Sequence, residues 1–392
     1  MPEVVIVSAV RTPIGRLGGA LRQHTAVELG ALVLAEAVRR AGIEPEEVDE
    51  VIVGHARQAG NGPNPGRLMA MKAGLPAQAP AHTVQMACVS SMKALILAYQ
   101  SIALGEAQVV AVAGCEHMSS IPYLLFDVRW GRRMGDGVLV DGMYRDGFID
   151  PLSGKHMGEL AEGWAERFGI GREEQDRYAL RSQQLAARAE AAGIAGRIRI
   201  PAPAKEKGAP PVAADEHPRP DTTLEALSRL PPVFRRDGTV TAGNASGITD
   251  GAVAAVVMSG AAAARRSLKP LAVIRATDLY GLRPEDYGLA PAYSIQRALS
   301  KAGLRLDDVG HIEINEAFAV QVLACLRLLG IDPDERVNPY GGAIALGHPV
   351  GMSGLRVAAY AALGLSEGAA RYAVASLCGN GGHAGTVVLE RP

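Results

Sequence analysis

Apolar and polar residues follow one pattern twice along the chain. Residues 39–54 and 300–315 align without a gap, and each runs from the end of a helical stretch through Ala-Gly and an acidic turn into an apolar strand. Residues 105–115 and 368–378 also match, because each is a short apolar strand that ends at a cysteine ten residues after a glycine. An internal repeat of this length predicts two similar structural units.

Helices and strands alternate within each unit. A helical stretch with small residues at its start precedes each cysteine-ending strand, and it follows Cys88 in the first unit and His348 in the second. The last strands are predicted at residues 251–259 and 385–390. The order strand, helix, strand, helix, strand, with mostly apolar strands, predicts an α/β fold in which helices flank a mixed sheet.

The residues between Cys115 and Gly251 have no counterpart in the second unit. They include a charged helical stretch at 173–193 and a proline-rich segment at 201–220. We interpret this insertion as a separate loop domain that projects from the first unit, since long insertions usually form lids or binding loops. A solvated decoration without a role is the alternative.

Composition narrows the functional classes. The chain has 392 residues, more than the roughly 250–300 at which single cores stop growing, and 48% of them are hydrophobic. A net charge of −1 gives no basic excess for nucleic acid. The N-terminal residues lack the features of a signal peptide, and the most apolar long window, residues 251–264, is too short to span a membrane. We therefore expect a soluble protein that binds neither nucleic acid nor membranes.

The four cysteines are widely spaced, with no CxxC pair and no His/Cys metal spacing. This usage is typical of a reducing compartment, so we expect a cytoplasmic protein without a metal site. Cys88 precedes a helical stretch, where the helix dipole favours the thiolate, although a small buried residue is the alternative. Cys378 ends a strand of the second unit before a glycine-rich loop whose N–H groups suit a developing oxyanion.

Two further polar residues lie at strand ends or helix starts. Asn315 follows a strand, where a simple helix N-cap is the alternative. His348 lies among the glycines of residues 341–354, so either the chain turns sharply there or something approaches its backbone closely. Ligand sites of α/β sheets lie beyond the carboxyl ends of strands, so we expect these residues to meet Cys378 there. Pseudo-twofold pairing of the units would bring Cys88 to the same place.

Two cysteines and a histidine at one site can divide the work of covalent catalysis. One thiolate can act as nucleophile, one group as its base, and one as a second acid or base. A metal site is the competing interpretation, but single residues on scattered loops lack the paired spacing of metal ligands.

Seven segments together strongly resemble the thiolases, which are acyl-CoA C-acetyltransferases of the acetoacetyl-CoA and 3-ketoacyl-CoA type. The resemblance covers essentially the whole chain. The segments are VRTPIG at 10–15, KHMG at 155–158, DEHPRPDTT at 215–223, TVTAGNASGITDGA at 239–252, NEAFA at 315–319, NPYGGAIALGHPVGMSG at 338–354 and the cysteine–glycine loop from 378.

The resemblance implies a thiolase-like five-layered α/β/α/β/α core built from two similar halves, with an inserted loop domain that covers coenzyme A. The implied N-terminal half comprises residues 1–118 and 250–269. The loop domain then comprises residues 119–249, and the C-terminal half residues 270–392.

The resemblance also implies catalytic roles. Cys88 would carry the acyl group as a thioester, His348 would take the Cys88 proton, and Cys378 would move the α-carbon proton of the acetyl group. Asn315 would hold a water that forms one oxyanion hole with His348, and the backbone N–H groups of Cys88 and Asn380 would form another. The glycines around His348 would then admit two thioester substrates and a second catalytic loop.

Substrates and assembly follow from the same resemblance. Coenzyme A and acyl-CoA would be substrates, with no permanently bound cofactor, and His156, Met157, Arg219 and Ser246 are the candidate contacts to coenzyme A. Residues 127–143 resemble the loop that joins thiolase dimers, which predicts a homotetramer, with a dimer as the alternative. Acyl-chain length and the direction of the reaction stay open.

Two other functions are weighed against this one. A ketoacyl synthase shares the fold but generally uses one cysteine and two histidines, so the second cysteine and NEAFA disfavour it. An inactive acyl-CoA-binding relative would be expected to lose one of the four catalytic residues, and none is lost here. The departures from the usual thiolase pattern at Val89, Tyr287, Asn380 and His383 predict an effect on acyl-chain preference, because Tyr287 or His383 could narrow the pocket or add a hydrogen bond.

Overall fold

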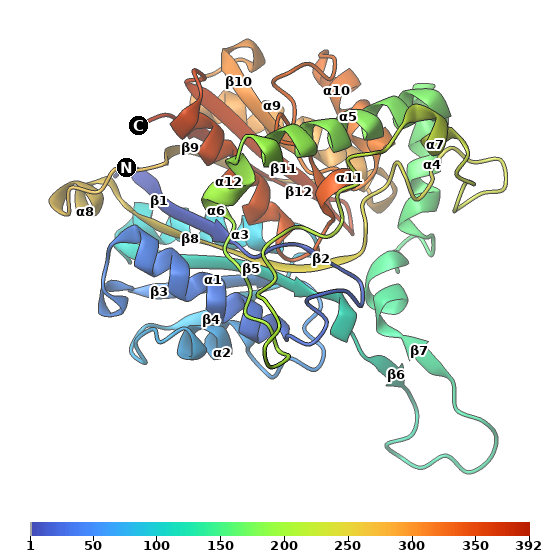
Figure 1. Cartoon of the computed structure of the whole chain (residues 1–392), viewed down its shortest axis with the longest axis horizontal. Coiled ribbons are helices and arrows are strands. Elements are labelled where there is room, and N and C mark those ends of the chain that lie inside the picture. Colours follow the sequence, from blue (N-terminus) through green and yellow to red (C-terminus); the bar gives the residue numbers. More distant parts are fainter. Residues whose placement is uncertain (1) are drawn as a thin grey trace.

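The structure, a computed structural model, describes residues 2–392. One mixed sheet of ten strands runs through both halves of the molecule (Figure 1). The N-terminal half contributes, in spatial order, β4 (Ala81–Val84), β3 (Glu50–His55), β5 (Val109–His117), β8 (Thr249–Ser259) and β1 (Val4–Arg11), with β2 (Gly15–Arg16) beside β8. The C-terminal half continues with β9 (Ala272–Gly281), β12 (His383–Glu390), β11 (Tyr372–Gly379) and β10 (Val309–Ile314).

The two halves repeat one strand order, which confirms the predicted repeat. Strands β3, β5, β8 and β1 lie in the same sequence as β10, β11, β12 and β9. In each half the first two of these strands pair in parallel and the third is antiparallel to the second. The halves join where Val5 and Ile6 of β1 pair with Val273 and Ala272 of β9.

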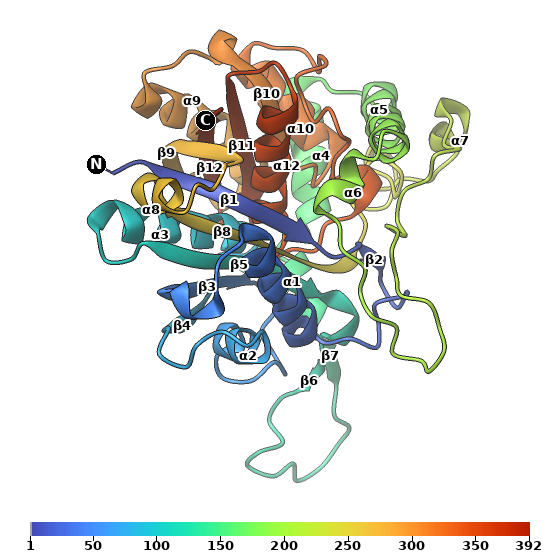
Figure 2. The same ribbon diagram turned by 60° about the vertical axis from the view of Figure 1, so that its left-hand side comes forward.

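Helices divide the molecule into five layers (Figure 2). Alternate residues of β5 show the division, since Val110 and Val112 belong to the central hydrophobic cluster whereas Val109, Ala111 and Ala113 belong to the outer one. The central layer is α3 (Ser90–Leu104) with α12 (Ser353–Glu367); the outer layers are α1 (Ala26–Ala41) with α2 (Pro65–Lys72), and α9 (Ala290–Ala302) with α10 (Ala319–Leu329). The short helix α8 (Gly260–Arg265) follows β8, and the short helix α11 (Ala343–Leu346) precedes His348.

The central helix α3 belongs to a longer apolar segment than residues 251–264. Residues Ala87–Leu104 have a mean hydropathy of 1.4 and are long enough to cross a bilayer. Over half of this segment, 56%, is buried inside the protein. The hydropathy of α3 therefore matches its place between two layers of the sheet, where it is covered on both sides.

The insertion between β5 and β8 differs from the expected separate domain. Its helices α4 (Met157–Phe168) and α5 (Arg172–Ala191) pack on the outer face of the C-terminal half, because Leu160, Trp164 and Tyr178 share one hydrophobic cluster with Leu323 of α10. The insertion also includes α6 (Ile194–Ile198), α7 (Leu224–Ser228) and the strands β6 (Tyr123–Leu125) and β7 (Leu139–Asp141). It therefore leaves the first half and completes the core of the second.

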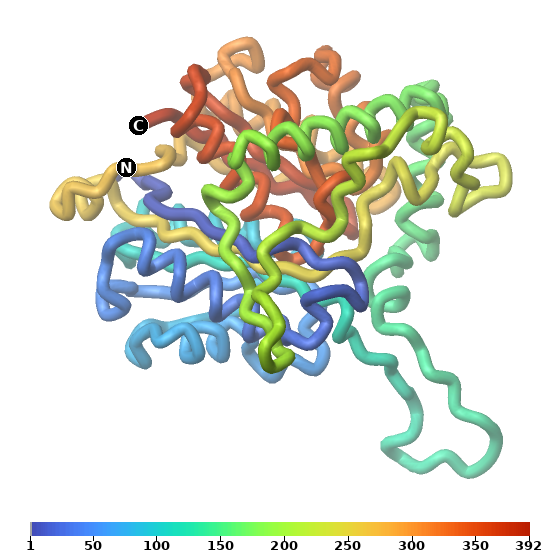
Figure 3. Tube along the Cα trace, in the orientation of Figure 1, coloured from blue at the N-terminus to red at the C-terminus, as the bar shows by residue number. Residues whose placement is uncertain are grey.

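One part of the insertion does project from the body. Strands β6 and β7 pair as a hairpin that extends away from the rest of the chain (Figures 1 and 3). Its loop exposes large apolar side chains, with Trp130 and Met134 each 89% exposed. A contiguous exposed apolar surface of this sort is typical of an association site.

Candidate active site

Cys88 lies in a tight turn between β4 and α3. The residue before it, Ala87, has a left-handed φ of 48°, which is unfavourable for any residue except glycine. The Ser90 hydroxyl stabilises this turn, because it accepts from the Met86 N–H at 2.9 Å and donates to the Ala87 carbonyl at 2.6 Å. The turn places the Cys88 sulfur beside the first turn of α3, as the sequence predicts.

His348 lies in the equivalent connection of the C-terminal half, between α11 and α12. Its glycine neighbours accommodate protein atoms. A Cβ on Gly347, whose φ is +98°, would lie 2.4 Å from the Thr249 side chain, and one on Gly351 would lie 2.3 Å from the Cys115 carbonyl oxygen. The expectation that these glycines admit substrates is therefore wrong, since close packing between the two halves requires them.

A hydrogen-bonded link joins the two connections. The Ser91 hydroxyl on α3 donates to the Met352 carbonyl at 3.1 Å and accepts from the Leu355 N–H of α12 at 3.0 Å. Glu116 links the His348 loop to the residues after β3, because its carboxylate accepts from the backbone N–H of Arg57 at 3.1 Å and of Gly351 at 2.9 Å. The Ser91 contacts hold the start of α3, beside the Cys88 turn, against the His348 loop.

The two connections open onto one cavity of about 450 Å³. Cys88, His348 and Cys378 all line it, and so does Asn380. The candidate coenzyme A contacts also lie on its wall; these are His156, Met157, Arg219 and Ser246. The structure therefore brings together eight of the nine residues that sequence reasoning selected.

The contacts of His348 are compatible with a base at Nε2. The Ser353 hydroxyl lies 2.6 Å from His348 Nδ1 and 2.9 Å from the Pro349 carbonyl oxygen. When Ser353 donates to Pro349, Nδ1 carries the ring proton and Nε2 carries the lone pair. Nε2 is buried without a protein partner. Burial, followed by the charge of Arg356, lowers the pKa of His348 to about 3. The imidazole is thus a neutral base with its free nitrogen unoccupied.

Asn315 is the ninth residue, and it lies behind the cavity wall with no exposed surface. It does not cap a helix, because α10 begins four residues later at Ala319. The Arg356 guanidinium donates to its Oδ1 at 3.0 Å. Since a guanidinium can only donate, this contact defines the amide orientation and leaves Nδ2 as a buried donor without a protein partner. Such a donor is where an ordered water is expected.

Both cysteines hold their protons at neutral pH. Burial raises the pKa of Cys88, while the charge of Arg57 and the backbone N–H groups of Asn380 and Cys88 act in the opposite direction. Burial, together with the neighbouring Cys88, raises the pKa of Cys378. Each thiol therefore needs a base before it reacts as a thiolate.

Aromatic rings support the coenzyme A candidates. His156 caps α4, where its Nδ1 accepts from the Gly158 N–H at 3.1 Å, so Nε2–H is free to donate. Its ring lies 4.7 Å from that of Phe234 and 5.9 Å from that of Phe148. Arg219 is exposed, and its backbone N–H is bound to Gln183 at 2.8 Å, which leaves the guanidinium on the cavity rim.

The departures from the usual thiolase pattern occupy different places. Tyr287 lines the catalytic cavity, donates to the Met157 carbonyl at 3.3 Å and contacts Trp164 edge-on at 4.8 Å. Val89 fills space beside Gly379, where a Cβ would lie 2.9 Å from it. His383 lines a neighbouring cavity and is absent from the wall of the catalytic one. Tyr287 is therefore in position to narrow the catalytic cavity itself, and His383 only the neighbouring one.

Three charged residues of the site escaped sequence reasoning: Arg57, Glu116 and Arg356. Arg57 and Glu116 lie at the carboxyl ends of β3 and β5, which is a place where α/β proteins bind ligands. Their position at strand ends is the feature of the sequence by which Arg57 and Glu116 could have been identified. Arg356 lies in the first turn of α12, and nothing in the helical pattern distinguishes it from an exposed arginine. Among residues 2–392, no group of three or more His, Cys, Asp or Glu side chains is arranged to hold a metal ion.

Comparison with known proteins agrees with this geometry. The thiolase N-terminal domain matches residues 4–261 and the thiolase C-terminal domain matches residues 268–391. The chain therefore belongs to the thiolase family. An acetyl-CoA acetyltransferase of Chromobacterium violaceum is 45% identical over the full length of both chains, and a probable acetyl-CoA acyltransferase of Staphylococcus aureus is 44% identical.

Solved structures show the same fold over the whole chain. The acetyl-CoA acetyltransferase from Syntrophomonas wolfei superposes with a TM-score of 0.97 at 41% identity, covering all of both chains. Human mitochondrial 3-ketoacyl-CoA thiolase, solved in complex with CoA, superposes with a TM-score of 0.96 at 39% identity, covering all of this chain and 98% of that one. These matches confirm the predicted five-layered thiolase fold.

Proposed function

We propose that this thiolase transfers an acyl group between coenzyme A and the α-carbon of acetyl-CoA through a thioester on Cys88. The substrates would be two acetyl-CoA in equilibrium with acetoacetyl-CoA and coenzyme A, or longer 3-ketoacyl-CoA. The observation that carries the proposal is that two thiols and a neutral imidazole from both halves of the chain meet on one cavity.

The first step is acyl transfer to the enzyme. His348 Nε2 takes the Cys88 proton, and the thiolate attacks the carbonyl carbon of acyl-CoA. The tetrahedral oxyanion is stabilised by the backbone N–H groups of Cys88 and Asn380, and each such donor contributes about 10²–10³ in rate. The bond to the coenzyme A sulfur then breaks, and that sulfur takes the proton from His348.

The second step forms the carbon–carbon bond. His348 Nε2 first takes the Cys378 proton; the Cys378 thiolate then takes a proton from the α-carbon of a bound acetyl-CoA, and the enolate carbon attacks the Cys88 thioester. A water on Asn315 Nδ2, together with the protonated His348, would stabilise the enolate oxygen. The Cys88 thiolate leaves as the product forms and takes the proton from His348, while Cys378 keeps the α-carbon proton. Thiol, imidazole and amide groups supply every step, so the reaction needs no resident cofactor or metal.

The direct test is the acyl-enzyme. Incubation with acetyl-CoA and removal of free coenzyme A should give a mass increase of one acetyl group, localised to the peptide that contains Cys88. We expect the label on Cys88 because this residue is half-buried and lies in a turn beside His348. Label found mainly on the Cys378 peptide would reverse the two roles. A ketoacyl synthase would also be acylated, but Cys378 would then be dispensable for condensation.

Assembly and location belong to the same proposal. The β6–β7 hairpin, with its exposed Trp130 and Met134, supports a homotetramer built as a dimer of dimers. Light scattering at micromolar concentration should therefore give four times the chain mass of 40.9 kDa, and a monomer would contradict this assembly. The four free thiols support a cytoplasmic location.

A further inference from the structure

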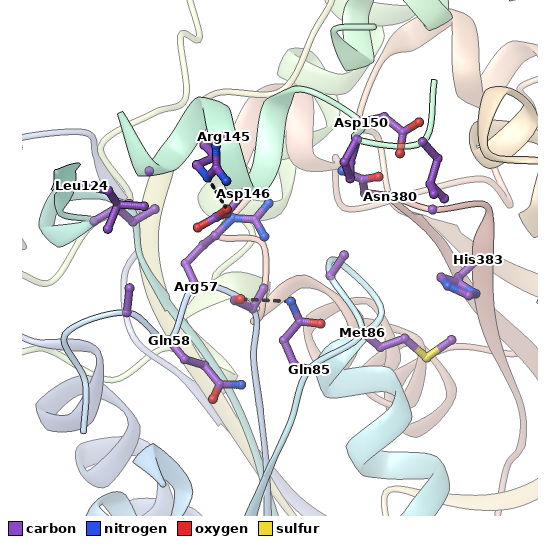
Figure 4. A pocket seen from close by; sticks show the side chains of 18 of the residues that line it. Arg57, Gln58, Gln85, Met86, Leu124, Arg145, Asp146, Asp150, Asn380 and His383 are labelled. Carbon is purple, nitrogen blue, oxygen red and sulfur yellow. Dashed lines mark hydrogen bonds and ion pairs between the residues drawn. The ribbon is translucent and has the colours of Figure 1, made fainter. Parts of the chain in front are cut away.

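A second cavity of about 730 Å³ adjoins the catalytic one (Figure 4). Met86 and Ala87, the two residues before the nucleophile, lie on its wall. Arg57 and Asn380 line both cavities. The second cavity therefore begins where the acyl group on Cys88 would end, and none of the steps proposed above uses it.

The boundary between the cavities is rigid and polar. A Cβ on Gly147 would lie 2.4 Å from the Arg57 guanidinium, so this side chain packs directly against the Gly147 backbone. The Asn380 amide donates to the Gly147 carbonyl at 3.2 Å. The backbone N–H of Arg57 is held by Glu116 at 3.1 Å. The guanidinium is thus held in place beside the nucleophile by its surroundings.

The Arg57 guanidinium forms no close ion pair in residues 2–392, although its charge acts on the buried Glu116 carboxylate. In residues 2–392, no carboxylate oxygen lies within the 4.0 Å of an ion pair from its guanidinium, and Nε is buried without a hydrogen-bond partner. A half-buried cation without a partner is costly, and it marks a place where an anion binds. Arginine also presents a fork of N–H donors that matches a carboxylate.

The other charged side chains of the second cavity do not form an ion pair with Arg57. Arg145 lies 4.0 Å from Asp146 and stacks on Phe126 at 4.3 Å, so these two charges offset each other. Asp150 accepts from the Ser153 N–H at 2.7 Å, and its Oδ1 has no partner. Figure 4 shows Asp150 beside Asn380, on the side of the cavity away from Arg57 and Arg145. Asp150 is therefore not a partner of Arg57, and Asp146 faces Arg145.

We propose that the second cavity receives the distal end of the acyl group carried by Cys88, and that Arg57 selects acyl groups ending in a carboxylate. This inference rests on the proposed acyl transfer through Cys88. A carboxylate on a short acyl chain would bind the unpaired guanidinium, whereas a methyl group in the same place would leave the cation desolvated and unpaired. The preference is a property of the acyl-transfer step and needs no new chemistry.

The test compares two acyl groups that differ only at their ends. Succinyl-CoA and butyryl-CoA each deliver a four-carbon acyl group, one with a terminal carboxylate and one with a methyl. Rates of Cys88 acylation are measured by quenched-flow mass spectrometry. A hydrogen-bonded charge pair of this kind corresponds to about 10- to 100-fold in rate, so succinyl-CoA should react faster than butyryl-CoA by that factor.

Substitution of Arg57 should abolish the preference. Arg57→Met should reduce the succinyl-to-butyryl rate ratio to one or below, and Arg57→Lys should restore part of it. The matched control is Arg145→Met, which removes a cation of the same cavity that already has a partner, and it should keep the wild-type ratio within about twofold, the scatter of a screened surface charge.

Each outcome decides the proposal. Equal rates in the wild type, or a preference that survives Arg57→Met, would overturn it. An equal loss of both rates in Arg57→Met would also overturn it, because Arg57 would then stabilise the Cys88 thiolate for any acyl group. Failure of the proposed acyl transfer itself is distinguishable, since no acyl group, acetyl included, would then appear on Cys88.

Discussion

A Cys378→Ala enzyme is expected to become acylated at Cys88 and to lose carbon–carbon bond formation. Thioester exchange needs the Cys88 thiol, His348 and the oxyanion donors, all of which stay in place. Condensation also needs the α-carbon proton to move, and loss of one acid or base group costs about 10²–10⁴ in rate. The acyl-enzyme mass and the rate of acetoacetyl-CoA thiolysis measure the two steps separately.

Cys115→Ala is the matched control for this variant. Cys115 ends the corresponding strand of the N-terminal half, and it is equally buried, but its sulfur contacts Met69 at 3.8 Å away from the cavity. Cys115→Ala should keep its turnover rate within about threefold of the wild type, because the substitution is a small change in a core that stays folded. Normal condensation by Cys378→Ala would mean that His348 performs both proton transfers, and the two-cysteine mechanism would have to be abandoned.

A His348→Gln enzyme is expected to lose acylation and condensation together, each by about 10²–10⁴, because the glutamine amide cannot take a proton. The wild-type acylation rate should show no inflection near pH 6.5, the ordinary histidine value, since burial lowers the pKa of His348 to about 3. Acylation rates between pH 5 and 8 measure this. An inflection near pH 6.5 that disappears in His348→Gln would contradict a neutral, buried base.

The same substitution has a consequence for stability. The unfolded chain protonates this histidine below about pH 6.5, whereas the folded protein keeps it neutral down to about pH 3. The unfolded state therefore binds one more proton between these values, and the free energy of unfolding falls by about 1.4 kcal/mol per pH unit as the pH drops through them. The free energy of unfolding, measured with denaturant, should fall between pH 7 and pH 5 in the wild type. In His348→Gln this fall should be smaller by about 2 kcal/mol.

The repeat, and the places of Cys88 and Cys378 at element ends, were predictable because they depend on local pattern. The strand before Cys378 and the helix after Cys88 follow from hydrophobic periodicity and small residues, and both form as predicted. The contact between Arg356 and Asn315 was not predictable. A buried arginine with one acceptor looks like any helical arginine until the central layer closes over α12.

The glycines near His348 show a different limit. Their number correctly indicated a close approach, but a sequence does not say what approaches. The neighbour proved to be the Cys115 carbonyl of the other half, about 240 positions away along the chain, which only tertiary packing can reveal. The insertion was misjudged for the same reason, since the apolar faces of α4 and α5 gave no sign of which half they cover.

The place of β12 in the sheet affects how the protein is made. Strand β12 (His383–Glu390) follows every other strand along the chain, yet it lies between β9 and β11 inside the sheet. The C-terminal half thus cannot close until residues 383–390 have left the ribosome, and its many non-local pairings fold slowly. A nascent chain that ends before His348 carries Cys88 without its proposed base or its partner thiol. With the proposed roles, Cys88 is expected to stay unreactive toward cellular thioesters until the C-terminal half has folded.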